Sequence, residues 1–168
     1  GRFEDLMPHV RRFRIPYVDA NALIEATNEF WEYPMCDRDP LTRWSHGRVT
    51  LLGDAAHPMY PIGSNGASQT ILDARVLARE IRAHGVTSAA LLAYEDERRA
   101  ATTSIVLANR GNGPEQVMQT VEERAPNGFT RIDNVLSATE LQEAAAGYKR
   151  MAGFDKDILN NRGPIVPT

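Results

Sequence analysis

The stretch from Val49 to Glu80 constrains the fold more than any other part of the chain. It reads VTLLGDAAHPMYPIGSNGASQTILDARVLARE. It opens with a short apolar run at 49–52, whose branched residues predict a buried strand. A loop punctuated by prolines and glycines follows, and a helical pattern begins at about Gly66. A strand, a glycine-bearing loop and a helix start together bring bare backbone N–H groups up to a ligand.

The helix expected after Gly66 has an amphipathic pattern. Small and branched apolar residues share one face: Ala67, Ile71, Ala74, Ala78 and Ile81. Charged residues lie off that face: Asp73, Arg75, Arg79 and Arg82.

The start of this helix has the chemistry of a ligand site. The first N–H groups, around Ala67 and Ser68, lack intrahelical partners and carry about half a positive charge. No basic side chain lies between Gly53 and Asp73, so an electron-rich ligand atom would be held by backbone alone. The one carboxylate of the loop, Asp54, accepts hydrogen bonds and suits sugar or polyol hydroxyls. A ligand with hydroxyls at one end and a polarised carbonyl at the other fits this pattern.

Simpler interpretations exist for single residues. Asp54 alone is typical of a turn or helix cap, and the string 63–66 alone is typical of an ordinary loop. His57 suggests a metal or acid–base role, but no second His or Cys stands at ligand spacing, so we expect a structural role. Cys36 is interpreted as a small apolar filler rather than a nucleophile.

The whole string is more specific than its parts. Residues 53–57 read Gly-Asp-Ala-Ala-His, residues 61–66 read Pro-x-Gly-x-x-Gly, and Asp73 follows inside the helix. This string resembles the second flavin-binding motif of the single-component, FAD-dependent aromatic hydroxylases, the family of p-hydroxybenzoate and salicylate hydroxylases. The wider string 34–73 is similar to the phenazine-modifying branch, the 5-methylphenazine-1-carboxylate monooxygenases. Strong similarity covers about Glu32 to Arg110.

The resemblance implies a role for each loop residue. Asp54 would bind a ribityl hydroxyl of FAD, and Pro61 would pack beside the reactive edge of the isoalloxazine, with no residue serving as a certain catalyst. The N–H groups near Ala67 and Ser68 would meet the N1–C2=O2 edge, although many relatives carry Asn at the position of Ser68. The expected flavin contacts are Gly53, Asp54, Pro61, Gly63, Asn65, Gly66, Ala67 and Ser68. Met59 and Tyr60 are expected at the boundary between flavin and substrate, and no metal is expected.

The resemblance also implies a fold and a division of the chain. The expected class is α+β and mainly helical, the C-terminal fragment of an α/β, Rossmann-like FAD-binding fold with a few short strands. Residues 1–40 would be a remnant of the substrate-binding part, 41–110 the C-terminal half of the FAD-binding domain, and 111–168 a helical extension and tail. The Gly-x-Gly-x-x-Gly fingerprint is absent, since the string from Gly111 lacks its third glycine. The missing N-terminal dinucleotide-binding half is therefore expected on a longer enzyme.

The implied activity is aromatic hydroxylation. NADH or NADPH would reduce FAD, O2 would add at C4a to give a hydroperoxide, and a small aromatic substrate would take the distal oxygen. The 168-residue chain is expected to be inactive alone. One alternative is a non-catalytic helical module without cofactor, and another is a metal-dependent hydrolase that uses Asp54 and His57.

Composition excludes other classes of function. The chain has 168 residues, 42% of them hydrophobic, and a net charge of −3, without the basic footprint of a nucleic-acid-binding protein. No apolar run approaches the roughly 20 residues of a membrane span. A single cysteine excludes an internal disulfide and favours a reducing compartment, the cytoplasm.

The remaining segments are predicted from their local patterns. Two short N-terminal helices are expected, the first interrupted by Pro8 and the second capped by Asp19, and then a strand over 30–35. Gly85 should end the long helix, and a second long helix should run to about Asn109, with Glu95, Arg98 and Arg99 on its solvated side. Thr87 or Ser88 is expected to cap that second long helix. Helices at 115–124 and 139–151 follow, and Ser137 and Glu140 have capping-box spacing at the start of the latter. The tail from Asp155 is expected to be loosely ordered.

Overall fold

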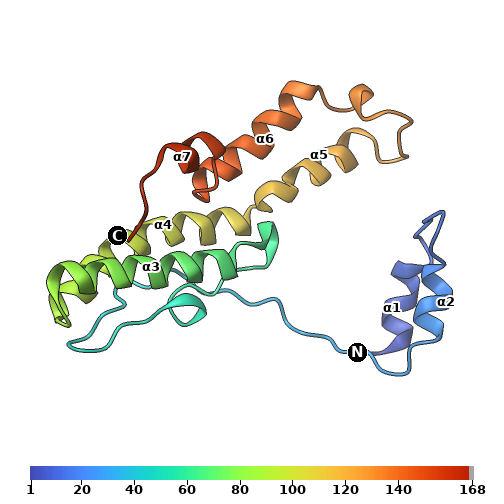
Figure 1. The fold of residues 1–168 in the computed structure, drawn as a ribbon. Coiled ribbons are helices and arrows are strands. Elements are labelled where there is room, and N and C mark those ends of the chain that lie inside the picture. Colours follow the sequence, from blue (N-terminus) through green and yellow to red (C-terminus); the bar gives the residue numbers. More distant parts are fainter. Residues whose placement is uncertain (167–168) are drawn as a thin grey trace. The chain divides into compact units, whose positions relative to one another are not determined.

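The computed structural model describes residues 1–166 and divides the chain into two compact units, Gly1–Met35 and the part from Cys36 onward. Figure 1 shows the helices of both units. The chain is mainly helical, as predicted, and none of its described helices is both long enough and apolar enough to cross a membrane.

The first unit is a pair of short helices, α1 (Phe3–Val10) and α2 (Ala20–Glu25), which contact each other. The Asp19 side chain accepts a hydrogen bond from the Ala22 N–H at 3.0 Å, so the predicted cap is confirmed. Pro8 lies inside α1 and does not interrupt it. The strand predicted over 30–35 is wrong, because the segment has no neighbouring strand to pair with in the described chain and leaves Trp31 exposed.

The second unit is built on two long helices, α3 (Gly66–His84) and α4 (Ser88–Arg110), which pack along each other (Figure 1). The turn between them places Gly85 at a φ of 72°, a left-handed conformation that glycine adopts without strain. Thr87 then caps α4 by accepting a hydrogen bond from the Ala90 N–H at 3.4 Å. The predicted helix starts and ends in this region are confirmed.

The strand predicted over 49–52 is wrong. Only an isolated antiparallel bridge between His46 and Val49 forms there, and the next residues are extended but unpaired with any strand of the described chain. The Leu51 N–H donates to the Trp44 carbonyl at 3.3 Å, and the Tyr94 hydroxyl donates to the Leu51 carbonyl at 3.1 Å. Because no neighbouring strand continues the ladder, a few single backbone bonds and the Tyr94 side chain hold this run. The few short strands of the predicted class are therefore absent from the described residues, and the Rossmann-like topology stays a prediction.

α3 packs on the core with the face opposite its alanine-rich face. Its buried side chains are Gln69, Asp73, Val76 and Glu80. Ile71 is 62% exposed, and Ala67, Ala74 and Ala78 are exposed as well. Asp73 is buried because α4 and the preceding loop supply its partners, as described below, and Glu80 pairs with Arg79 of α3 itself.

A small apolar core lies between the extended segment and the two long helices. Trp44, Ala56, Val76 and Tyr94 form it, with Leu41, Leu51, Leu77 and Ile165 packed around them. The Trp44 ring centroid lies 5.8 Å from that of Tyr94 and 5.6 Å from that of His57. Cys36 is exposed, so its predicted role as an apolar filler is wrong.

The C-terminal part adds further helices: η3 (Gly113–Glu115), α5 (Gln116–Arg124), η4 (Ile132–Asn134), α6 (Ala138–Met151) and α7 (Lys156–Asn161). Ser137 and Glu140 form a capping box at the start of α6, and α6 contacts both α5 and η3. The two predicted helices are confirmed. The tail, expected to be loosely ordered, contains the short helix α7, while Pro167 lies outside the described residues.

Candidate functional site

The loop between the extended segment and α3 has a defined shape. It contains two single turns of 3-10 helix, η1 (Gly53–Ala55) and η2 (Ile62–Ser64), and α3 begins at Gly66. Gly53 has a φ of 61°, and a side chain there would come within 2.9 Å of Thr70. Gly63 has a φ of 73°, and Ser64, at a φ of 52°, is one of the non-glycine residues with a left-handed backbone. Glycine is needed at 53 and 63 because it adopts a positive φ without strain, and these two residues therefore set the backbone path of the loop.

Asp73 holds the first part of the loop from inside. Its Oδ2 accepts from the Gly53 N–H at 3.0 Å and from His57 Nε2 at 2.6 Å, and its Oδ1 accepts from Arg98 Nε at 2.7 Å. Burial by itself would raise the pKa of Asp73, but the hydrogen bonds and charges of His57 and Arg98 outweigh it and lower that pKa. The carboxylate therefore stays ionised and joins the loop to both long helices.

His57 has the structural role that we expect from the sequence. Its side chain is buried at 4% exposure, and its Nε2 is bonded to Asp73 rather than to Asp54. Nδ1 is buried without a hydrogen-bond partner among the described residues. The hydrolase alternative needs His57 and Asp54 to bind one metal ion, whereas the His57 ring is buried and its Nε2 is bonded to Asp73.

The predicted solvated side of α4 is wrong for two of its three members. Arg98 is 6% exposed and Glu95 is 4% exposed. The Glu95 carboxylate accepts from the Ser45 N–H at 2.7 Å and pairs with Arg99 at 3.5 Å. Arg98 also donates to Gln69 Oε1 at 2.6 Å, so it binds two side chains of α3 at once. The i, i+3 spacing of Glu95 and Arg98 could not predict these partners, which lie 50 and 25 positions away in the sequence.

The outer side of the loop is formed by its exposed residues. Asp54, Pro61 and Ala67 are exposed, and Asp54 forms no hydrogen bond within the described part of the chain. No side chain caps α3, whose first turn closes with the Gln69 N–H donating to the Asn65 carbonyl at 2.9 Å. The N–H groups of residues 66–68 therefore have no intrahelical partner. An added Cβ at Gly66 would lie 3.9 Å from Asp54 Oδ1, so this carboxylate and the helix start are close neighbours.

The other predicted site residues lie deeper. Gly53 and Asn65 are buried, and Gly63, Ser68, Met59 and Tyr60 are partly buried. The Asn65 amide donates to the Tyr148 hydroxyl at 2.6 Å, and the Tyr60 carbonyl accepts from the Asn109 amide at 3.1 Å. The predicted residues thus belong to one segment, but some are exposed, such as Asp54 and Pro61, and others are buried against the rest of the chain, such as Gly53 and Asn65. Their contact with a flavin stays a prediction.

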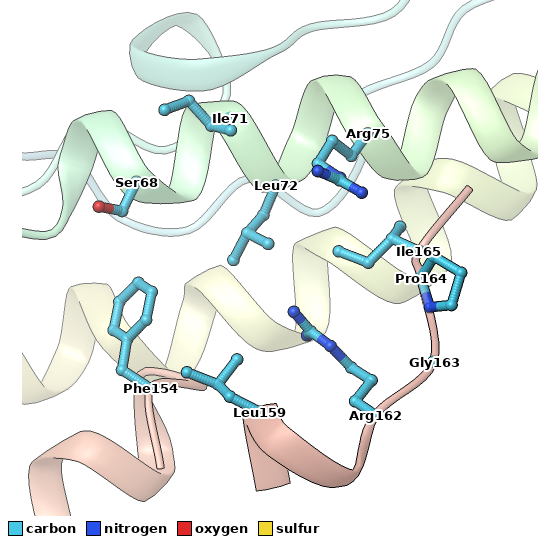
Figure 2. A pocket seen from close by; sticks show the side chains of 10 residues that line it. All are labelled: Ser68, Ile71, Leu72, Arg75, Phe154, Leu159, Arg162, Gly163, Pro164 and Ile165. Atoms are coloured by element: carbon cyan, nitrogen blue, oxygen red, sulfur yellow. The ribbon is translucent and has the colours of Figure 1, made fainter. Parts of the chain in front are cut away.

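A separate cavity of about 380 Å³ adjoins the candidate site (Figure 2). Its lining comes from α3 and from the C-terminal segment: Ser68, Ile71, Leu72, Arg75, Phe154, Leu159, Arg162, Gly163, Pro164 and Ile165. Figure 2 shows the Ser68 side chain at one end of it. Of the predicted flavin contacts, Ser68 alone lines this cavity, so the cavity and the outer side of the loop are distinct.

The comparison with known families decides the class of this loop. Residues 23–109, which are more than half of the chain, match the family described as FAD binding domain. The chain belongs to this FAD-binding family. The match contains the entire loop and both long helices up to Asn109, and it stops before η3 and α6.

Relatives of this FAD-binding chain are hydroxylases and monooxygenases by name. Phenazine 1,6-dicarboxylic acid hydroxylase PhzS of Lysobacter antibioticus is 51% identical over 110 residues, which are 66% of this chain and 27% of that protein. 6-Hydroxynicotinate 3-monooxygenase of Bordetella bronchiseptica is 43% identical over 93 residues, 54% of this chain and 24% of the relative. 3-Hydroxybenzoate 6-hydroxylase 1 of Aquipseudomonas alcaligenes is 44% identical over 89 residues, 53% of this chain and 23% of the relative.

These matches confirm the family recognised from the Gly53–Asp73 string, the FAD-dependent aromatic hydroxylases, and a phenazine hydroxylase is among them. The chain spans about a quarter of the length of the curated relatives it matches.

Proposed function

We propose that residues 53–68 form the part of an FAD site that receives the ribityl chain and the N1–C2=O2 edge of the isoalloxazine. The observation that carries the proposal is the free, exposed carboxylate of Asp54 beside the uncapped start of α3. The Asp54 carboxylate accepts hydrogen bonds, and the N–H groups at the start of α3 donate them. This pair matches a ligand that has hydroxyls next to an electron-rich ring edge.

The physical advantage of a helix start at this place is electrostatic. Reduced flavin is anionic at N1 and O2, and the partial positive charge of a helix N-terminus favours a negative charge there. Backbone N–H groups held by the loop need no reorganisation when that charge develops. No Lys or Arg side chain lies between Gly53 and Asp73 to compete for the same atoms.

The outer surface of the loop suits the two neighbouring parts of the cofactor. Asp54 would accept from a ribityl hydroxyl, and Pro61, which is exposed, would lie flat beside the ring. Gly53, Gly63, Asn65 and Gly66 would shape the backbone that approaches it, while Met59 and Tyr60 would lie toward the substrate. The diphosphate needs a Gly-x-Gly-x-x-Gly unit, which this sequence does not contain, so another polypeptide segment would supply it.

The activity proposed for the flavoprotein that carries this chain is hydroxylation of a small aromatic substrate. FAD, when bound, accepts a hydride from NADH or NADPH and activates O2. The relatives are named for ring acids, a phenazine dicarboxylic acid, a hydroxynicotinate and a hydroxybenzoate, and we propose a substrate of the same chemical class. The residues of this chain would bind and orient the ring system rather than transfer protons themselves.

Asp54→Ala tests the proposal, with Ser68→Ala, in the first turn of α3, as the matched control. In the flavoprotein that carries this chain, loss of a hydrogen bond to a carboxylate should weaken FAD binding by about tenfold or more. Ser68→Ala should change FAD affinity by less than about twofold, since its proposed donor is the main-chain N–H. Fluorescence titration with FAD measures both. Equal affinities for the parent protein and Asp54→Ala would remove Asp54 from the site, and no FAD binding by the parent protein would favour the non-catalytic module.

A further inference from the structure

We infer that Tyr148 of α6 is a positioning residue for the cofactor loop, holding residues 60–65 from the side opposite the flavin. The inference rests on the proposed function for the identity of the ligand. The contacts that support it are hydrogen bonds between residues of this chain and involve no ligand. Asn109 is the last residue matched by the FAD-binding family, and the other two side chains that hold the loop, Glu115 and Tyr148, lie beyond the matched part.

The Tyr148 hydroxyl lies between two amide side chains. It accepts from Asn65 Nδ2 at 2.6 Å and donates to Asn109 Oδ1 at 2.8 Å. Burial raises the pKa of Tyr148, so the hydroxyl keeps its proton at neutral pH and serves as donor and acceptor together. Asn65 and Asn109 are buried at 4% and 0% exposure, and removal of the hydroxyl would leave both without this partner.

Two more hydrogen bonds reach the loop from the same side. Asn109 Nδ2, at the end of α4, donates to the Tyr60 carbonyl at 3.1 Å. The Gly63 N–H donates to Oε1 of Glu115, in η3, at 3.2 Å. Tyr148 is joined to Asn109 directly, so α4, η3 and α6 act on the loop as one connected set.

The closeness of Tyr148 to the loop explains why residue 63 is glycine. A Cβ at Gly63 would lie 2.2 Å from the Tyr148 hydroxyl oxygen and 2.6 Å from its ring carbon Cζ. Gly113 is similarly constrained, because a Cβ there would lie 3.0 Å from Tyr148 Cε2. The tyrosine ring is thus seated against two glycine Cα atoms, and small movements of α6 are transmitted to the loop backbone.

The two sides of the loop do not compete for the same groups. Tyr148 and Glu115 use the Asn65 side chain and the Gly63 N–H. Asp54 and the N–H groups at the start of α3 remain free on the outer side. A loop fixed in this way keeps its donors aimed before the ligand arrives, which reduces the ordering cost of binding.

Tyr148→Phe tests the inference, with Ser137→Ala as a matched control. Ser137 caps the same helix and touches neither Asn65 nor Asn109, so Ser137→Ala weakens α6 without changing the contacts of Tyr148. Amide hydrogen exchange of residues 60–65 is measured on the full chain without FAD. We expect exchange about tenfold faster in Tyr148→Phe and near the parent rate in Ser137→Ala. FAD titration of the flavoprotein that carries this chain should show about fivefold weaker binding for Tyr148→Phe alone.

The outcomes separate this inference from the proposed function. Equal loop exchange in Tyr148→Phe and Ser137→Ala would overturn the positioning role, whatever the FAD affinity. Fast loop exchange with unchanged FAD affinity would overturn the part of the inference that concerns the cofactor. Faster loop exchange in Tyr148→Phe than in the parent, together with no FAD binding by the parent, would sink the proposed function and leave the loop contact established.

Discussion

The two faces of α3 differ in a way that the hydrophobic pattern does not reveal. The inner face carries Gln69, Asp73 and Glu80 with Val76, and the outer face carries Ile71 among small alanines. Charged side chains are buried only where partners neutralise them. For Asp73 those partners are Arg98 of α4 at 2.7 Å and His57 of the loop at 2.6 Å, whereas Glu80 pairs with Arg79 of the same helix at 2.7 Å. The difference teaches that a periodic pattern identifies the residues that share a face, whereas distant partners decide which face is inside.

The largest change in the free energy of unfolding should come from removing the Asp73 charge on the inner face. Asp73→Asn leaves the Arg98 guanidinium buried without its carboxylate and weakens the bonds to Gly53 and His57. Loss of one member of a buried ion pair lowers the free energy of unfolding by about 3–5 kcal/mol. Urea denaturation followed by circular dichroism measures the change. The double variant Asp73→Leu with Arg98→Met should recover part of the loss, because it leaves no unpaired charge. A single variant as stable as the parent would show that these charges are not what holds the inner face.

Part of the same loss of unfolding free energy is expected at low pH, where Asp73 becomes protonated. The folded-state pKa of Asp73 lies below its ordinary value of 3.8, so the ionised carboxylate stabilises the folded state above that value. The contribution disappears as the pH falls below about 4 and through the folded-state pKa. Unfolding free energies measured between about pH 7 and pH 2.5 should therefore fall more steeply in the parent than in Asp73→Asn. The difference between the two proteins isolates Asp73 from other titrating carboxylates such as Glu95. Parallel pH profiles would contradict this account.

The smallest effect is expected on the outer face. Ile71→Ala removes a side chain that is 62% exposed and should change the free energy of unfolding by less than about 0.5 kcal/mol. Val76→Ala removes fewer atoms from a position at 2% exposure on the same helix and should cost about 2 kcal/mol. Thermal or urea unfolding of the pair compares the two faces directly. A larger cost for Ile71→Ala than for Val76→Ala would reverse the comparison.

The sequence was sufficient for the features that depend on local chemistry. Gly66 starts α3, Gly85 and Thr87 form the turn between the long helices, and Ser137 with Glu140 caps α6, as predicted. Each of these signals comes from backbone preference or from a side chain within a few residues. The family string from Gly53 to Asp73 is local in the same sense, which is why the FAD-binding family could be recognised.

The features that failed depend on distant partners. The runs at 30–35 and 49–52 have the composition of strands, but no neighbouring strand pairs with them in the described chain. Arg98 reaches Asp73 across 25 positions, and Tyr148 reaches Asn65 across 83, so neither contact leaves a trace in a short window of sequence. The candidate site was therefore predictable as a segment, while the side chains that hold it in place were not.

The turn at the far end of α3 has a practical consequence. Val86 is 86% exposed, and a helix of 19 residues spans about 28 Å from the cofactor loop to this turn. With the exposed Cys36 replaced by serine, a fluorescent label on a cysteine introduced at position 86 would lie far from the loop on the same helix. The efficiency of energy transfer from such a dye to a bound flavin would then measure the distance between position 86 and the isoalloxazine ring.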